Sequence, residues 1–353
     1  MGLKVSATCE LSFGAEHPAV GTLVGDVHEG IKQMFMIIEH ARMLVGTKAI
    51  ATLSTGYLNA LDYARTRVQG GELSKMADKA APRVTIMHHP DVRRILMLQK
   101  AYAEGMRALV LYTATFQDAV QLARAAGTTD EHAEAMNDLL LPLVKGLGSE
   151  RAYEMLTLTL QTFGGSGYLQ DYPVEQYLRD AKIDSLYEGT TAIQGLDLYF
   201  RKIVRNQGEA LTALLTEIRQ TAGAEHGNGR LKKERAALAR AADNIEAMVS
   251  TLHGYLAGSL DQPGEIDRIG MNTTRLLLSL GDLVVGWLLV RQSEIATRAL
   301  DDGPAEAGDT AFYQGKVAAA RFFAEAVLPR LAAEREIVET TSTDLMELPE
   351  SAF

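Results

Sequence analysis

Most of the chain repeats apolar residues at the spacing of an α-helix. From Glu29 onward, apolar positions recur at steps of three, four or seven residues, and the pattern continues to about Val68, where Gly70-Gly71 ends it. The same periodicity predicts further helices over residues 90–125, 130–163, 173–182, 191–206, 231–256, 265–300 and 309–337. Pro142 lies inside the predicted helix of residues 130–163 and predicts a kink or a break there.

The segments between these helices contain the residues that break regular structure. Residues 71–89 predict a loop, and the polar, Gly-rich stretch from Gly223 to Gly229 is the best candidate for a domain boundary. In the first ~25 residues, Val5 and Leu11 lie among Ser, Gly and Pro, which is typical of a strand end followed by a loop. We therefore expect strands only in the first thirty residues and an all-α fold elsewhere. Helices longer than about 25 residues fit two up-and-down bundles that follow one another along the chain.

Composition narrows the class of protein. The 353 residues suffice for about two domains, and 47% hydrophobic with 23% charged residues is ordinary for a soluble protein. Cys9 is the single cysteine, which excludes an intrachain disulfide framework and a Cys-based zinc cluster. A net charge of -10 excludes a broad nucleic-acid surface.

No secretory signal precedes the helices, because residues 1–13 lack a basic region followed by an apolar one. The apolar stretch from Leu276 to Val290 is shorter than the ~20 residues of a membrane span and contains Asp282. It predicts a buried helix, and we expect a cytoplasmic protein.

Two short motifs are candidates for chemistry. Gly164-Gly165-Ser166-Gly167 follows a helix, so it is either a helix cap or a loop that a phosphate or a neighbouring chain approaches closely. In Tyr187-Glu188-Gly189-Thr190-Thr191, one of the threonines caps the helix that follows. Glu188 is then either a solvated carboxylate near a helix N-terminus or a general base beside a flexible glycine.

Arginines and histidines supply further candidates. Arg42 interrupts an apolar helix face, where it either pairs with Glu39 or holds a phosphate or carbonyl of a ligand. Arg65 and Arg67, near the end of the same helix, are either favourable C-terminal charges or a phosphate clamp. The adjacent histidines 88 and 89 have no partner at the spacing of a metal site, so no metal is assigned.

Taken together, the residues from Gln161 to Thr190 resemble the C-terminal signature of the acyl-CoA dehydrogenases. The matching segments are Gln161-Thr162-Phe163-Gly164-Gly165-Ser166-Gly167-Tyr168, Tyr172-Pro173-Val174-Glu175, Arg179-Asp180-Ala181-Lys182-Ile183 and Tyr187-Glu188-Gly189-Thr190. Residues 1–13 resemble the last strand of that family's middle β-domain. The resemblance covers about residues 1–207. The later helices resemble, in length and helicity, the extra C-terminal domain of longer members such as the bacterial long-chain fatty acyl-CoA dehydrogenases.

This resemblance implies a reaction. It implies α,β-dehydrogenation of an acyl-CoA thioester with FAD, in which Glu188 takes the α-proton and its backbone N–H donates to the thioester carbonyl. Other subfamilies place the base on the first long helix, one residue before the arginine that Arg42 matches. That position is Ala41 here, which favours Glu188 as the base.

The resemblance also implies ligand contacts. Glu39, Arg42 and Gly189 would bind the substrate. The FAD contacts would come from residues at three places in the chain: Arg67 and Gln69, then Gln161, Gly164 and Gly165, and finally Thr190. Arg67 would reach the pyrophosphate across a dimer. A homodimer or homotetramer follows, because one FAD is shared between two chains, and an electron-transfer flavoprotein or another acceptor would take the electrons. Gln69, Gly70, Ala192 and Gly195 depart from the residues common in the family.

The expected organisation is threefold: residues 1–25 as the end of the middle β-domain and a linker, residues 26–208 as a four-helix-bundle domain, and residues 209–353 as an additional helical domain.

Four interpretations of the function stay open. The chain is the catalytic-base and oligomerisation half of a dehydrogenase for a long-chain acyl-CoA, a non-catalytic assembly module, part of an acyl-CoA oxidase, or a dehydrogenase for a sulfur-containing or branched acyl-CoA. The chain would be part of a longer enzyme or one half of a split enzyme, joined by a separate N-terminal half. The intact Glu188 motif argues against the assembly module.

Overall fold

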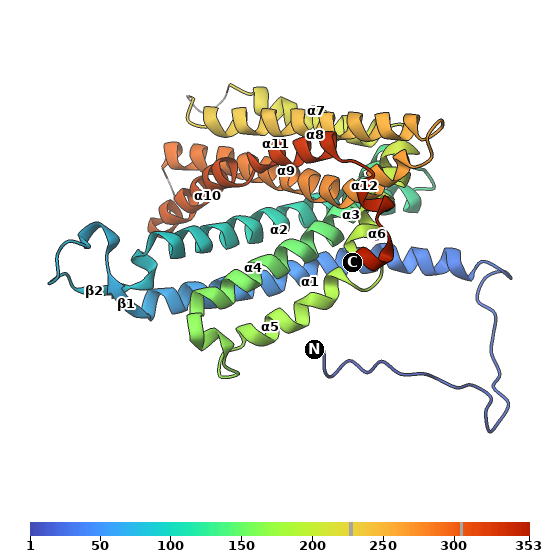
Figure 1. Cartoon of the computed structure of the whole chain (residues 1–353), viewed down its shortest axis with the longest axis horizontal. Coiled ribbons are helices and arrows are strands. Elements are labelled where there is room, and N and C mark those ends of the chain that lie inside the picture. Colours follow the sequence, from blue (N-terminus) through green and yellow to red (C-terminus); the bar gives the residue numbers. More distant parts are fainter. Residues whose placement is uncertain (226–228, 304–305) are drawn as a thin grey trace.

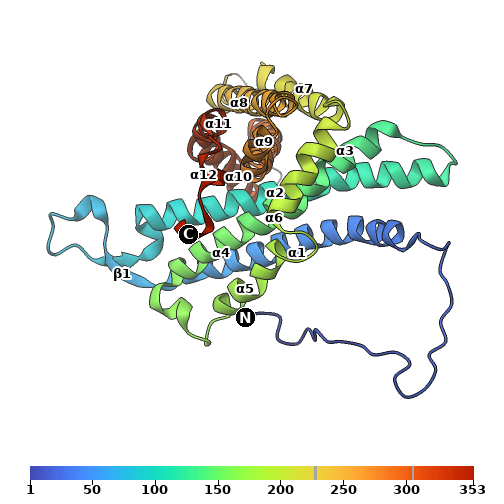
Figure 2. The same ribbon diagram turned by 45° about the vertical axis from the view of Figure 1, so that its right-hand side comes forward.

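The structure, a computed structural model, is built almost entirely from helices and describes residues 1–225, 229–303 and 306–353. The helices stack in layers, with α1 and α4 on one side, α2 next, then α9 to α11, and α7 and α8 on the far side (Figures 1 and 2). The elements of the first half are α1 (Gly30–Thr66), β1 (Val68–Gly71), β2 (Arg83–Thr85), α2 (Pro90–Ala125), α3 (Glu131–Pro142), α4 (Gly148–Phe163), α5 (Val174–Ala181) and α6 (Thr191–Leu196). Those of the second half are α7 (Glu209–Gly223), α8 (Lys232–Gly258), α9 (Glu265–Asp302), α10 (Ala307–Ala326), α11 (Arg330–Thr340) and α12 (Asp344–Glu347).

Helices α1 and α4 form the side of the first bundle that holds the predicted site, and they run in the same direction. Gly46 faces Val144 near the start of this contact, and Tyr63 stacks on Phe163 at its end, with ring centroids 4.3 Å apart. A Cβ atom at Gly46 would lie 2.3 Å from Cγ1 of Val144, so only glycine permits this approach. The second half of α1, from Gly46 to Tyr63, therefore lies along the length of α4.

Two π-helical segments interrupt the helices of this bundle. Residues Leu143–Leu147 form the first, directly after Pro142, and Asp197–Val204 form the second, directly after α6. The expected break at Pro142 is confirmed. A π turn contains an extra residue, which changes the direction of the side chains that follow.

Helix α9 is the central helix of the second half. It is long and apolar enough to span a membrane by composition, but 83% of its most apolar window is buried inside the protein. It packs against α2, α6, α8 and α10, which confirms the prediction of a buried helix. At Gly195 of α6 a Cβ would lie 2.8 Å from the carbonyl carbon of Thr273, so this glycine lets the two backbones meet.

One apolar core joins both halves of the chain. It is one contiguous cluster that extends from Ala49 in α1 to Val338 in α11. Within it, the hydroxyl of Tyr102 and the guanidinium of Arg151 both donate to the buried carboxylate of Asp282. These three residues belong to α2, α4 and α9, so one polar cluster joins three helices. The domain boundary near residue 208 stays a prediction.

Four expectations about the elements were wrong. The first 29 residues contain neither strand nor helix, because a strand needs a partner for its backbone groups and the described chain offers none there. The short sheet lies instead in the predicted loop, where β1 and β2 pair antiparallel. Helix α7 was not expected, and Pro329 divides the expected helix 309–337. Part of the expected boundary, residues 226–228, lies outside the described residues.

The first turns of α1 extend beyond the rest of the bundle (Figure 1). Ile31, Phe35, Met36 and Ile37 are exposed there. The segment before them runs back along the outside and meets α5, where the backbone N–H of Leu3 donates to Asp180. An apolar helix surface is thus left open at the end of the bundle that lies nearest to Arg42.

Candidate active site

Glu188 lies in a tight turn between a short 3-10 helix, Lys182–Ser185, and α6. Glu188 has φ of 53° and Gly189 has φ of 93°, so two successive residues adopt the left-handed conformation. Such a conformation is strained for Glu and natural for Gly. The turn presents the Glu188 side chain to solvent, while the carbonyl groups of both residues face the interior.

Two fully buried side chains meet those carbonyl groups. The Lys145 ammonium, from the π-helical segment after α3, donates to the Gly189 oxygen at 2.5 Å. The Gln194 amide, from α6, donates to the oxygens of Gly189 and Glu188 at 3.3 and 3.4 Å. Burial lowers the pKa of Lys145, and the nearby Glu188 carboxylate acts in the opposite direction.

The start of the turn is anchored by a second set of contacts. The buried Asp184 accepts from Lys48 of α1 at 2.7 Å and from the Tyr187 hydroxyl at 3.1 Å. Burial and the Asp184 charge raise the pKa of Tyr187 to about 12. Thr190 is the N-cap residue of α6, and the Thr191 hydroxyl donates to Glu150 of α4 at 2.5 Å. The turn that carries Glu188 is therefore fixed from both sides.

Arg42 lies on α1 close to α6, and its described partner lies in the segment that follows α6. Its guanidinium donates to Asp197 at 2.9 Å, and both side chains are largely buried. The Glu39 side chain lies outside the described residues, so a pair between Glu39 and Arg42 is not described. The Nε atom of Arg42 is buried and has no partner among the described residues, which leaves one donor available in this region.

The remaining predicted residues gather at the opposite end of α1 and α4. Arg67 ends α1, Gln69 lies in β1, and the hydroxyl of Tyr63 donates to Ser166 beside the Gly164 turn at 3.2 Å. All of the predicted residues at this end are exposed: Arg67, Gln69, Gln161, Gly164 and Gly165. Added Cβ atoms at the two glycines would meet nothing within 4 Å, and the Arg67 guanidinium has no ion pair within the described chain. These residues form an open surface.

The two groups of predicted residues are far apart in one chain. Arg42 and Arg67 are 25 positions apart on α1, which at a rise of ~1.5 Å per residue places them about 37 Å apart along the helix. The structure therefore brings Glu188, Gly189, Thr190 and Arg42 together at one end and the other five residues together at the other. It does not bring the two groups together.

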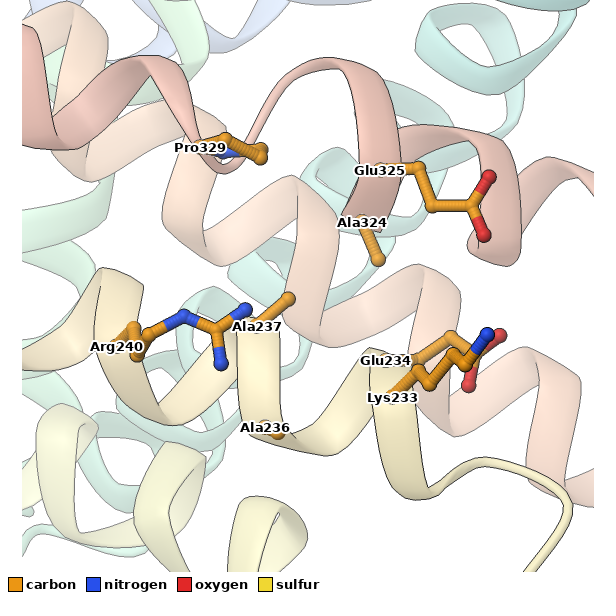
Figure 3. Close-up of a pocket in the computed structure, with 8 residues that line it drawn as sticks. All are labelled: Lys233, Glu234, Ala236, Ala237, Arg240, Ala324, Glu325 and Pro329. Carbon is orange, nitrogen blue, oxygen red and sulfur yellow. The ribbon is translucent and has the colours of Figure 1, made fainter.

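Two hollows on the described surface are lined by none of the predicted residues. Figure 3 shows one of about 330 Å³ between α8 and the junction of α10 and α11, and none of its eight lining residues was predicted. A larger groove of about 670 Å³ lies between α1, α2 and α3 and includes His40 and Asn137. Neither contains Glu188, whose carboxylate stands on an open face.

Sequence reasoning missed the buried residues that support the Glu188 turn. Lys145 stands in the apolar run from Leu139 to Leu147, and a charged residue in such a run was a usable signal. Asp184 and Gln194 gave no comparable signal, because polar residues in short helices are usually solvated.

Comparisons with known proteins cover nearly the whole chain. The family model described as acyl-CoA dehydrogenase, C-terminal domain, matches residues 28–201, and the one described as acetyl-CoA dehydrogenase C-terminal like matches residues 214–349. The chain is 60% identical over 354 residues to the broad-specificity linear acyl-CoA dehydrogenase FadE5 of Mycobacterium tuberculosis. This match includes all of the chain and 58% of the relative. It is 35% identical over 348 residues to the 3-methylmercaptopropionyl-CoA dehydrogenase of Ruegeria pomeroyi, across 98% of the chain and 56% of the relative.

Solved structures have the same fold. The Caenorhabditis elegans ACDH-11 structure, in complex with C11-CoA, aligns with 90% of the chain and 49% of its own, at a TM-score of 0.60 and 22% identity. The acyl-CoA dehydrogenase of Bacillus anthracis, complexed with FAD, aligns with 90% of the chain and 55% of its own, at a TM-score of 0.59 and 17% identity. The chain thus spans little more than half the length of the curated relatives it matches. With both of its helical halves matched by C-terminal models of one family, the chain belongs to the acyl-CoA dehydrogenases.

Proposed function

We propose that the chain carries the catalytic base of an FAD-dependent acyl-CoA dehydrogenase, with Glu188 removing the α-proton of a fatty acyl-CoA in β-oxidation. One observation carries this proposal: Glu188 stands exposed on a turn whose carbonyl groups are held by two buried side chains. A solvated carboxylate that merely interacts with a helix end needs no such support. Ala41, at the alternative position for the base, has no ionisable group.

The residues of the chain divide the chemistry between them. Glu188 takes the α-proton, and its N–H stabilises the enolate-like thioester oxygen, since preorganised donors act on the charge that develops there. Gly189 leaves room for the thioester, and the Arg42 guanidinium, which is partly exposed, suits the oxygens of the CoA arm. When bound, FAD supplies the acceptor for the β-hydride.

The open surface at the other end of the bundle fits a dinucleotide. Arg67 offers a guanidinium for a pyrophosphate, and the bare backbone at Gly164 and Gly165 allows an adenosine group to approach. Because this surface lies about 37 Å from Arg42 along α1, we propose that it serves the FAD of a second copy. Gln69 and Gln161 complete the proposed contacts of this surface, whereas Thr190, at the Glu188 end, would contact the flavin bound there. The proposed assembly is a homodimer or homotetramer. We also propose an electron-transfer flavoprotein as the electron acceptor.

The substrate we propose is a linear, long-chain acyl-CoA. The identity of 60% to a relative named for linear acyl-CoA supports a linear chain. A sulfur-containing acyl-CoA is the second candidate, because a relative at 35% identity is named for one.

Replacing Glu188 by Gln tests the proposed role of this residue. In the flavin-loaded enzyme, with the chain joined to the N-terminal half of the flavin site, Glu188→Gln should lower turnover at least ~10²-fold, because a general base contributes on that scale. Flavin content, read from the visible spectrum, should not change. Glu209→Gln, an exposed glutamate at the start of α7, is the matched control and should keep full turnover. Near-normal turnover of Glu188→Gln would rule out this assignment.

A further inference from the structure

Two buried donors from different elements converge on the turn that carries Glu188. Lys145 comes from the π-helical segment Leu143–Leu147, and Gln194 comes from the first turns of α6. Both side chains have 0% exposure, and both donate to the carbonyl oxygen of Gly189. Gln194 also reaches the carbonyl oxygen of Glu188 at 3.4 Å.

These contacts oppose the natural tendency of the turn. A non-glycine residue such as Glu188 rarely adopts a φ of 53°, and it persists only where the surroundings enforce it. The donors pull the two carbonyl groups inward, and this orientation directs the Glu188 side chain outward. A Cβ atom at Gly189 would lie 2.9 Å from the Gln194 nitrogen, so the amide fits closely under the turn.

Placing an ammonium in this position is costly, and the local backbone is arranged to permit it. An uncompensated charge is unfavourable in a protein interior, and burial accordingly lowers the pKa of Lys145. The residue lies between Pro142 and Gly146, in a π turn, and such turns are frequent at functional sites. An apolar side chain would fill the same space without this cost.

We propose that Lys145 and Gln194 are positioning residues, which hold the turn in its strained form and thereby aim the Glu188 carboxylate at the α-proton. The inference rests on the proposed function of Glu188. Neither side chain is exposed to a ligand, so their loss should slow proton removal and leave substrate binding unchanged.

Hydrogen exchange on the chain itself tests the structural half of this proposal. The variants are Lys145→Met, which removes the donor at similar length, and Gln194→Leu. Lys202→Met is the matched control, because Lys202 is also mostly buried in a π-helical segment and is paired at 2.8 Å with Asp138. Peptides covering residues 185–194 should exchange at least ~10-fold faster in both variants, and the core peptides of α9 should not change. Unchanged exchange of that segment in either folded variant would overturn the proposal.

Stopped-flow reduction of the flavin by a long-chain acyl-CoA tests the catalytic half. In the flavin-loaded enzyme, each variant should reduce its flavin at least ~10-fold more slowly, with a larger effect of α-deuteration and with the substrate Kd within about twofold of wild type. A general loss of structure would instead weaken substrate binding and flavin retention together. A wild-type reduction rate in either variant would overturn the proposal.

The two experiments separate this inference from the proposed function. If Glu188→Gln keeps its turnover, the proposed function fails, and the exchange measurement still decides whether the two residues hold the turn. If Glu188→Gln is inactive and both variants reduce flavin normally, only the positioning role fails. Should Lys145→Met fail to fold, Gln194→Leu tests the same turn from α6.

Discussion

At the scale of single residues, buried charges hold parts of the molecule together. Asp282 of α9 accepts hydrogen bonds from Tyr102 and from Arg151, and it is nearly inaccessible to solvent. Burial raises the pKa of Asp282, whereas the Arg151 charge acts in the opposite direction. The carboxylate is stable in this position because its partners compensate for the lost hydration.

Removing Arg151 should therefore destabilise the protein strongly. Arg151→Met leaves Asp282 buried with only the Tyr102 hydroxyl, and we expect a loss of about 3–5 kcal/mol in the free energy of unfolding, measured with urea. In the folded variant, the full loss of unfolding free energy is expected at a pH above the raised pKa of Asp282, where the buried carboxylate is charged. The loss should become smaller as the pH falls through that pKa, because the carboxyl group becomes neutral. Arg219→Met, which removes the exposed pairs with Asp243 and Glu246, should cost no more than about 1 kcal/mol. Equal losses in the two variants would contradict the compensating role of Arg151.

The predicted site contains residues that are neighbours in sequence, which the sequence identifies, and contacts between distant positions, which it does not. Glu188 and its neighbours are recognisable because they follow one another along the chain, and the structure places them on one turn. Lys145 precedes Gly189 by 44 positions, and the contact exists only after α3, the π turn and α6 are packed. Arg42 was expected either to pair with Glu39 or to hold a ligand group, and its described partner is 155 positions away. Local spacing predicts none of these long-range pairs.

At the scale of elements, close helix contacts depend on glycine. Gly46 brings α1 against the start of α4, beside the segment that carries Lys145. The periodicity of apolar residues predicted the long helices well, because each buries one face along its length. It did not predict β1, whose Val-Gln-Gly-Gly sequence has no alternating pattern and whose four residues are exposed. It also could not separate α10 from α11 without weighing Pro329.

Adding a methyl group at Gly46 should disturb this packing. Gly46→Ala would place Cβ 2.3 Å from Val144, and we expect a loss of about 1–3 kcal/mol in stability because the helices must separate. Gly270→Ala in α9 is the control, since a Cβ there meets nothing within 4 Å and alanine favours helix by up to ~1 kcal/mol. Thermal unfolding followed by circular dichroism measures both changes. A Gly46→Ala protein as stable as Gly270→Ala would show that the contact can relax.

At the scale of the whole molecule, the two predicted bundles share one core. The apolar cluster includes Leu147 before α4 and Leu280 in α9 alike, and Asp282 ties α9 to α2 and α4. The two family models divide the chain between residues 201 and 214, yet one apolar cluster contains residues from both sides of that division. A sequence pattern shows where the helical periodicity of apolar residues is interrupted, whereas the extent of a core depends on how the helices pack.

A shared core predicts joint folding. A chain that ends at residue 208 would lack α9 and expose the apolar faces of α2 and of the segment after α3, so we expect no cooperative thermal transition from residues 30–208 alone. The chain of 353 residues should unfold in one transition in the same calorimetric measurement. A sharp, reversible transition of the shorter chain would show that the first bundle is an independent domain.

The π-helical segment after Pro142 has a consequence for changes in chain length. Its turn holds one residue more than a regular helix, so deleting a single residue from Leu143–Leu147 would restore regular turns and leave the later turns of the helix facing almost as before. The side chains inside the segment would change direction, so Lys145 would leave its place beneath the Glu188 turn while α4 keeps its packing against α1. The exposed loop of residues 72–82 can absorb an insertion or a deletion locally, because no helix register depends on it. A scan of single-residue deletions along the chain should therefore be tolerated in that loop and lethal to function in the π turn.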